Sequence, residues 1–148
     1  MLGNRWYNEK AMECLNCKSR LIKRYQKKFC SNKCQANYQY QLYIDKWKKG
    51  NVSGNRGINT KNISAHIKKY LVNKYGERCY KCGWNKKHFK GYVPLEMDHI
   101  DGNSENNKDD NLRLLCPNCH SLTLNFKNLN KGKGRIWRTK KYLINQRP

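Results

Sequence analysis

The sequence predicts small α+β domains that are held together by their cysteines rather than by a large hydrophobic core. Only 37% of the 148 residues are apolar, and this class includes ten tyrosines. The eight cysteines form four close pairs: Cys14/Cys17, Cys30/Cys34, Cys79/Cys82 and Cys116/Cys119. Between the last two pairs, an alternating segment, a turn-rich loop and a short apolar segment predict two strands that precede a helix.

Closely paired cysteines are typical of structural zinc sites, whereas disulfide frameworks usually spread their cysteines along a secreted chain. The first residues, MLGNRWYNEKAMEC, contain no apolar core of a signal peptide, and no apolar run approaches the length of a membrane span. We therefore expect two zinc ions in a reducing, cytoplasmic compartment, and no membrane partner. One ion would be bound by Cys14, Cys17, Cys30 and Cys34, and the other by Cys79, Cys82, Cys116 and Cys119. Disulfides are the alternative.

The charge indicates a polyanionic partner. The chain has 32 Lys and Arg against 10 Asp and Glu, a formal net charge of +22, and cationic side chains bind nucleic acids by displacing counterions from phosphates. Six of the ten acids lie between Glu96 and Asp110, and nine Lys and Arg but no acid follow Asp110. An acidic cluster opposes phosphate binding unless a cation bridges the two. This pattern suits a metal-dependent phosphodiester enzyme, whereas a merely soluble basic surface is the simpler alternative.

Residues 1–49 are expected to form an N-terminal zinc module of the treble-clef or zinc-ribbon type. The segment LIKRYQKKF between its cysteine pairs predicts a short exposed hairpin. From Cys34 the chain lacks Gly and Pro, which predicts a helix that ends at Gly50. Residues 50–62, GNVSGNRGINTKN, predict a linker.

A second domain is expected at residues 63–135, followed by a basic tail at 136–148. Ile63, Ile67 and Leu71 predict a helix over 63–75, capped by Asn62 or Ser64 and ended by Gly76. A knuckle follows at 79–83, and YVPLEMDHI predicts a strand. The loop DGNSENNKDD leads to Asn111, which opens the strand LRLL. Pro117 begins a helix that is expected to continue through Leu124.

The stretch from Leu95 to His120, LEMDHIDGNSENNKDDNLRLLCPNCH, resembles the HNH endonucleases, whose signature is His, Asn and His on a ββα-metal fold. The signature residues here are His99, Asn111 and His120, with Asp98 directly before the first histidine. Cysteine pairs flank the motif, as in the zinc-knuckle version of the family. The resemblance covers about residues 62–130, and the whole arrangement resembles small phage-encoded, homing-like HNH proteins.

The resemblance implies roles that the chemistry of the side chains supports. Asp98 supplies an oxygen ligand and His120 a nitrogen ligand to a catalytic divalent ion, and the open positions of the ion take water and the scissile phosphate. His99 accepts the proton of the attacking water, because a neutral imidazole suits that task near pH 7. Asp98 and His99 would face opposite sides of a regular strand, and the family resemblance implies a bend there. Asn111 holds the loop and orients His99.

Each of these assignments has an alternative. Asp98 would otherwise be a surface acid, His99 a structural histidine, and His120 an extra zinc donor. The softness of the donors favours Mn²⁺, Ni²⁺ or Zn²⁺, whereas cellular abundance favours Mg²⁺. We expect activity with Mg²⁺ and also with Mn²⁺ or Ni²⁺.

The remaining basic residues are expected to bind double-stranded DNA. The residues expected to follow the phosphate backbone after the motif are Lys127, Lys131, Lys133 and Arg135, and the N-terminal module is the expected specificity element. We expect a monomer or weak dimer acting in the cytoplasm of a phage-infected or bacterial host cell. Two other functions remain open: a zinc-stapled nucleic-acid-binding protein without catalysis, and an HNH nuclease of the restriction or packaging type.

Overall fold

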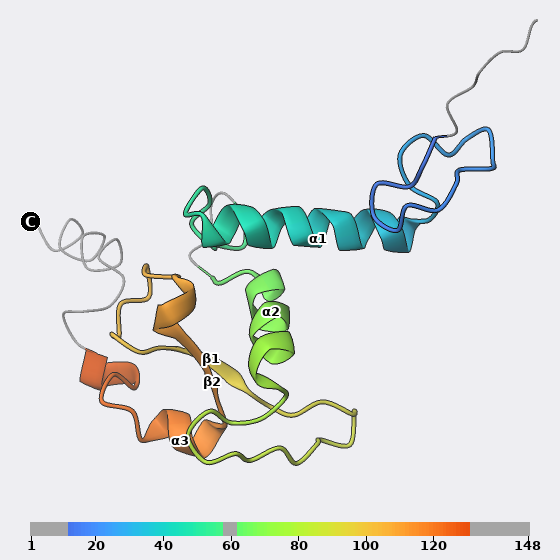
Figure 1. Cartoon of the computed structure of the whole chain (residues 1–148). Coiled ribbons are helices and arrows are strands. Elements are labelled where there is room, and N and C mark those ends of the chain that lie inside the picture. The colour runs from blue at the N-terminus through green and yellow to red at the C-terminus, as the bar shows by residue number, and fades with distance from the viewer. Residues whose placement is uncertain (1–11, 58–61, 131–148) are drawn as a thin grey trace, which may run out of the picture. The chain divides into compact units, whose positions relative to one another are not determined.

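The computed structural model describes residues 12–57 and 62–130, and it confirms a small α+β fold (Figure 1). Its elements, in chain order, are the helices and strands α1 (Asn32–Lys48), α2 (Ala65–Tyr75), β1 (Glu96–His99), η1 (Asp109–Asn111), β2 (Leu112–Leu115), α3 (Pro117–Ser121) and η2 (Lys127–Asn130). The η elements are short 3₁₀ helices. Within the described residues, no helix has the length and apolar character needed to cross a membrane.

The chain divides into two compact units, Met1–Tyr43 and Ile44–Pro148, and the division falls inside α1. The first unit contains the first two cysteine pairs, and the second contains the hairpin, α2 and α3. The domain boundaries expected from the sequence, at residues 49, 62 and 135, remain a prediction.

The long helices begin and end where their capping residues predict. The hydroxyl of Ser31 accepts a hydrogen bond from the Cys34 amide at 3.2 Å before α1, and Gly50 follows its end with a φ of 74°. Ser64 caps α2 by accepting from the His66 amide, and Gly76 follows with a φ of 82°. Both expected helices are therefore present, although α1 begins at Asn32 rather than Cys34 and α2 at Ala65 rather than Ile63.

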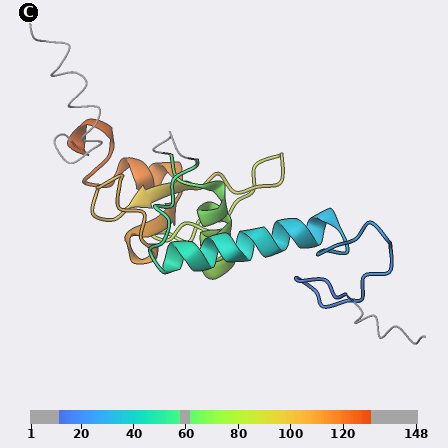
Figure 2. The same ribbon diagram turned by 90° about the horizontal axis from the view of Figure 1, so that it is seen from above.

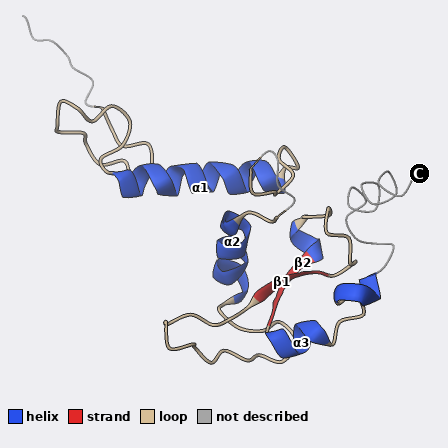
Figure 3. Ribbon diagram, turned by 180° about the vertical axis from the view of Figure 1, so that it is seen from behind, coloured by secondary structure: helices blue, strands red, loops and turns tan. Residues whose placement is uncertain are grey.

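The centre of the second unit is the antiparallel hairpin of β1 and β2, which lies between α2 and α3 (Figures 1 and 2). Leu114 and Leu115 of β2 and Ile67 and Leu71 of α2 are buried in the core of this unit, together with further apolar residues such as Val93, Leu95 and Leu112. Both strands have only four residues, so β1 is shorter than the expected strand and begins after Leu95. Long loops, rather than further strands, connect the elements (Figure 3).

The helix after the second cysteine knuckle is shorter than expected. α3 ends at Ser121, whereas the sequence predicted that it would continue through Leu124. Thr123 explains the difference, because its hydroxyl and its amide both donate to the carbonyl of His120, at 2.9 and 3.1 Å. Leu122 and Leu124 lie outside the helix and are 73% and 87% exposed, so they do not contribute to a core.

The hairpin expected between the first two cysteine pairs is also absent from the described residues. The pairing there is a single antiparallel bridge between Glu13 and Arg20. Gln26 explains why no strand forms, because its side-chain oxygen accepts from the amides of Ile22 and Lys23, and its nitrogen donates to the Cys30 carbonyl at 2.8 Å. These local bonds hold the segment in turns.

The first half of the expected linker packs against the second unit instead of forming a free tether. Gly54 is buried, its carbonyl accepts from the Ser64 amide at 2.9 Å, and its φ is 80°. A β-carbon at Gly54 would lie 2.8 Å from Ile67 Cδ1, 2.9 Å from Asn107 Cβ and 3.0 Å from Trp47 Nε1. Gly54 is thus required both by its backbone conformation and by its close packing.

We expect Gly54→Ala to lower the free energy of unfolding by about 2–5 kcal/mol, since the left-handed conformation costs about 1–2 kcal/mol and crowding adds about 1–3 kcal/mol. The matched control is Gly57→Ala, because Gly57 also has a φ of 80° but nothing lies within 4 Å of its added β-carbon. The control should lose only the backbone contribution, which urea denaturation can measure. If both variants lost the same free energy of unfolding, the side chains around Gly54 would be able to move aside at no cost.

Candidate active site and metal centres

Four cysteines of the second unit converge from two distant segments. Cys79 and Cys82 lie in a knuckle, whereas Cys116 caps α3 and Cys119 lies within it. Their sulfur atoms all lie within 4.8 Å of one another, and the Sγ atoms of Cys82 and Cys116 are 3.8 Å apart. Zinc–sulfur bonds of about 2.3 Å give a tetrahedron whose edges are about 3.8 Å. The cysteine set therefore has the donors and the spacing for a closed structural zinc site.

The cysteines of the first unit form a matching set. The Sγ atoms of Cys14, Cys17, Cys30 and Cys34 also lie within 4.8 Å of one another. Cys30 is central, because its sulfur lies 3.6 Å from that of Cys17 and 3.4 Å from that of Cys34. These two sets are the groupings that the cysteine spacing predicted, and each could hold a zinc ion.

The ionisation of the thiols in the second unit suits the binding of a cation. Burial opposes ionisation of Cys79, but hydrogen bonds from the backbone of Cys116, Cys82 and Lys81 lower the pKa of its thiol to about 6. The pKa of Cys119 is instead raised to about 12, first by its hydrogen bond with Cys82 and then by burial. One thiolate thus forms readily while its neighbour keeps a proton, because four negative sulfurs repel one another. A divalent ion removes that repulsion.

A second cluster, of charged side chains, lies on one face of the hairpin. Alternation along β1 places Glu96 and Asp98 on the same face. Asp98 is 5% exposed, and Arg113, its partner in the strand register, donates from Nε to Asp98 Oδ2 at 2.7 Å. The buried carboxylate is therefore paired through one oxygen, and its other oxygen, Oδ1, faces His120 from α3.

His120 lies between the two carboxylates. Its Nδ1 is bonded to Oε2 of Glu96, and its Nε2 lies 3.6 Å from Asp98 Oδ1. The latter distance is too long for a hydrogen bond, but two ligands that each bind one ion at about 2.1 Å are separated by about 3–3.6 Å. When Nδ1 donates to Glu96, the lone pair of Nε2 is free to bind a metal. The structure thus brings Asp98 and His120 together as a candidate two-ligand site.

Glu96 and Arg113 are site residues that the sequence analysis missed. Only Glu96 had a signal in the sequence. Glu96 precedes Asp98 by two positions in a predicted strand and so shares its face. Arg113 could be matched to Asp98 only after the hairpin register was known.

His99 takes part in a different set of contacts. It is the last residue of β1 and pairs with Leu112, so the strand stays regular through His99 and the chain turns at Ile100. Its Nε2 lies 2.9 Å from Oδ1 of Asn107, which is 4% exposed. The Asn107 amide nitrogen donates to the carbonyl of Ser53 at 3.0 Å, which fixes the orientation of the amide and leaves Oδ1 as the acceptor for His99. Neutral His99 therefore carries its proton on Nε2 and its lone pair on Nδ1.

Asn111 holds the loop that joins the two strands. Its amide nitrogen donates to Asp101 Oδ1 and to the Asn106 carbonyl, each at 2.8 Å, and its oxygen accepts from the Asp101 amide. Partial burial opposes ionisation of Asp101, but hydrogen bonds from Asn106, Asn103 and Asn111 lower the pKa of its carboxyl. Asn111 thus orders the loop, whereas Asn107, which the sequence analysis did not single out, is the asparagine that contacts His99.

The expected DNA-binding residues are only partly described. Lys127 is exposed in η2, and its Nζ lies 4.9 Å from the centre of the Phe126 ring. That ring in turn packs edge-on against His120, with the ring centres 5.3 Å apart. Lys131, Lys133 and Arg135 lie outside the described residues.

The segment that contains this site is similar in sequence to known proteins. Residues 79–125 match the HNH endonuclease family profile. A segment of 59 residues, 38% of the chain, is 48% identical to the H-N-H endonuclease F-TflIV of Escherichia phage T5. The match covers 24% of that relative, so the chain corresponds to about a quarter of its length. No solved structure matches the chain.

We expect the purified chain to contain two zinc ions, measured by elemental analysis. Cys116→Ser should remove one ion and unfold the second unit, because structural zinc contributes about 10–16 kcal/mol, as much as a whole domain's stability. Cys14→Ser serves as its counterpart and should remove the other ion while the second unit stays folded. Thiol titration of the denatured, metal-free chain should find eight free thiols, and a lower number would mean that disulfides replace the zinc.

Proposed function

We propose that this chain is a metal-dependent endonuclease that hydrolyses phosphodiester bonds of double-stranded DNA, because residues 79–125 match the HNH endonuclease family profile. The observation that carries the proposal is the geometry around His120. Its imidazole is oriented by Glu96 and directed at Asp98. His99 follows Asp98 in β1, and its contact with Asn107 fixes its tautomer. A protein that only binds DNA requires neither arrangement.

Asp98 and His120 would hold a divalent ion, whose chemistry there is to neutralise charge on the phosphate and the leaving oxygen. Mg²⁺ is the expected ion, with Mn²⁺ or Ni²⁺ as substitutes. Arg113 holds Asp98 Oδ2, so Oδ1 is directed at His120 without rotation of the side chain. Glu96 keeps the His120 ring in the orientation that presents Nε2. These two side chains lower the entropy that the ligands would lose on binding.

His99 would act as the general base. Its Nδ1 lone pair accepts the proton of the attacking water, and the resulting imidazolium keeps its Nε2–H on Asn107. Asn107 is itself held by Ser53, by Asn55 and by the Trp47 indole, which donates to its carbonyl at 2.7 Å. The proposed base, His99, is therefore positioned by a buried asparagine whose side chain and backbone carbonyl are all hydrogen-bonded.

The charge of the chain supports DNA as the substrate. A net charge of +22 gives a strong, salt-dependent attraction for phosphates. We propose that Lys127, Lys131, Lys133 and Arg135 follow the DNA backbone and that residues 1–49 form a DNA-binding module. The protein would act as a monomer or weak dimer, in a phage-encoded and homing-like role, in the cytoplasm of the infected or bacterial cell. Eight thiols in two metal-binding sets are consistent with that reducing compartment.

We expect the chain to nick or linearise supercoiled plasmid in Mg²⁺ or Mn²⁺, and EDTA to abolish this activity. His99→Ala should lower the rate about 10²–10⁴-fold, the usual contribution of a general base. His88→Ala is a matched control, because His88 packs against Phe89 and Tyr92 in a loop. Cleavage by all three proteins at the same rate would indicate a contaminant. Binding without cleavage on any DNA would favour a non-catalytic nucleic-acid-binding protein.

Asn107→Asp tests the contact between the amide and the base. A carboxylate beside His99 stabilises the imidazolium, so the acid limb of the pH–rate profile should move to higher pH by about one unit or more. Asn107→Ala should slow the reaction without that upward shift. A profile that stays in place in Asn107→Asp, in protein shown to be folded by circular dichroism, would remove Asn107 from the role of positioning the base.

A further inference from the structure

The N-terminal half of α1 presents a row of amide side chains to solvent. Asn32, Gln35 and Gln39 are all exposed, and their spacing of three and four residues places them on one face of the helix. From Asn32 to Tyr43 the helix contains no acid, and its exposed face is composed mainly of amides. An ordinary solvated helix face mixes Glu with Lys, so solubility alone does not account for this row.

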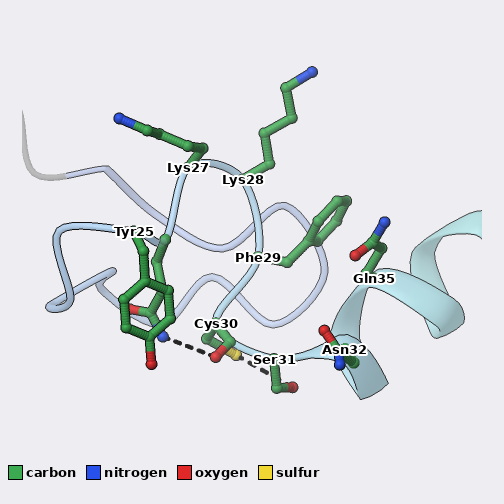
Figure 4. A pocket seen from close by; sticks show the side chains of 9 residues that line it. Tyr25, Lys27, Lys28, Phe29, Cys30, Ser31, Asn32 and Gln35 are labelled. Carbon is green, nitrogen blue, oxygen red and sulfur yellow. Dashed lines mark hydrogen bonds between the residues drawn. The ribbon is translucent and has the colours of Figure 1, made fainter.

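A pocket of 350 Å³ adjoins the start of this row. It is lined by the loop before α1 and by the first turn of the helix, and it contains no acidic side chain. In Figure 4, Phe29 faces Gln35 across the pocket, and Lys27 and Lys28 extend outward from the loop. Within the described residues, neither lysine has a carboxylate partner. The pocket therefore combines free cations with an amide at one site.

The charge around the row is strongly positive. Residues 12–43 contain seven Lys and Arg and one acid, Glu13. This surface complements a polyanion, and the amides add groups that both donate and accept hydrogen bonds. From Asn32 to Gln39 the helix rises about 10 Å, which matches about three base pairs of duplex DNA.

We propose that α1 is a DNA recognition helix, in which Asn32, Gln35 and Gln39 read base edges in the major groove while Lys27 and Lys28 bind the flanking phosphates. The major groove of duplex DNA accepts an α-helix. The side-chain amide of Asn or Gln can form two hydrogen bonds with one adenine, at its N6 and N7 positions. The row therefore selects sites with adenines at neighbouring positions. This inference depends on DNA being the partner, as the proposed function holds.

The test is a selection from random duplex DNA with the full-length, zinc-loaded chain carrying His99→Ala, so that bound DNA is not cut. An enriched motif with adenines is expected. Adding Gln35→Ala and Gln39→Ala should lower the preference for those adenines by about ten- to a hundred-fold per position, while non-specific binding stays unchanged. Gln41→Ala is the matched control, since Gln41 is exposed on the opposite face of the helix, and it should select the parent motif.

Lys27→Ala with Lys28→Ala should weaken binding to all sequences alike and reduce the slope of log K against log salt by about one per lysine. The proposal fails if no motif is enriched, if the double glutamine variant selects the parent motif, or if single-stranded DNA of the same sequence binds more tightly. Because cleavage is not measured here, the outcome is separate from that of the plasmid experiment. If the chain cuts plasmid but selects no motif, the proposed nuclease function stands and the proposed recognition helix is wrong.

Discussion

The structure of the second unit depends on the four cysteines that join its knuckle to α3. A two-stranded hairpin with four-residue strands and a helix of five residues are each too small to be stable in water. With zinc bound, the four sulfurs would close the loop between Cys82 and Cys116 and hold the start of α3 against the hairpin. His120 follows Cys119 directly, so the same constraint brings its imidazole to Glu96 and Asp98. The same four cysteines thus hold the fold of the second unit and position the candidate site.

Amide side chains have a comparable role on the other side of the hairpin. Asn111 gathers the backbone of the loop around Asp101, and Asn107 connects the loop to Ser53 and Asn55. These neutral groups order the loop beside His99 without adding further charge to a segment that already holds six of the ten acids. The charged side chains of Glu96, Asp98, His120 and Arg113 instead contact one another on one face of the hairpin. The two histidines therefore have different surroundings, one amide and one carboxylate, as their different proposed roles require.

Local signals in the sequence were sufficient for α1, for α2 and for the grouping of the cysteines. Ser64, Gly50 and Gly76 marked helix ends, and the spacing of the cysteines predicted their grouping. Contacts that depend on long-range register were not visible in the sequence. The pairing of Arg113 with Asp98 depends on the register of the hairpin, and the contact of Asn107 with His99 depends on how the loop folds back. The C-terminal end of α3 and the turns around Gln26 were missed because one side chain, Thr123 or Gln26, competes with regular structure for backbone groups.

The close packing around Gly54 bears on how loss-of-function variants of this chain would be interpreted. A side chain at position 54 would press on Asn107 and Trp47, and Asn107 holds His99. A genetic screen for inactive variants would therefore recover position 54 together with positions 98, 99 and 120, although Gly54 has no functional group to contribute. Such a screen separates chemistry from support only when each variant is also scored for folded protein. Position 54 would then be grouped with the scaffold, and the histidines with the reaction.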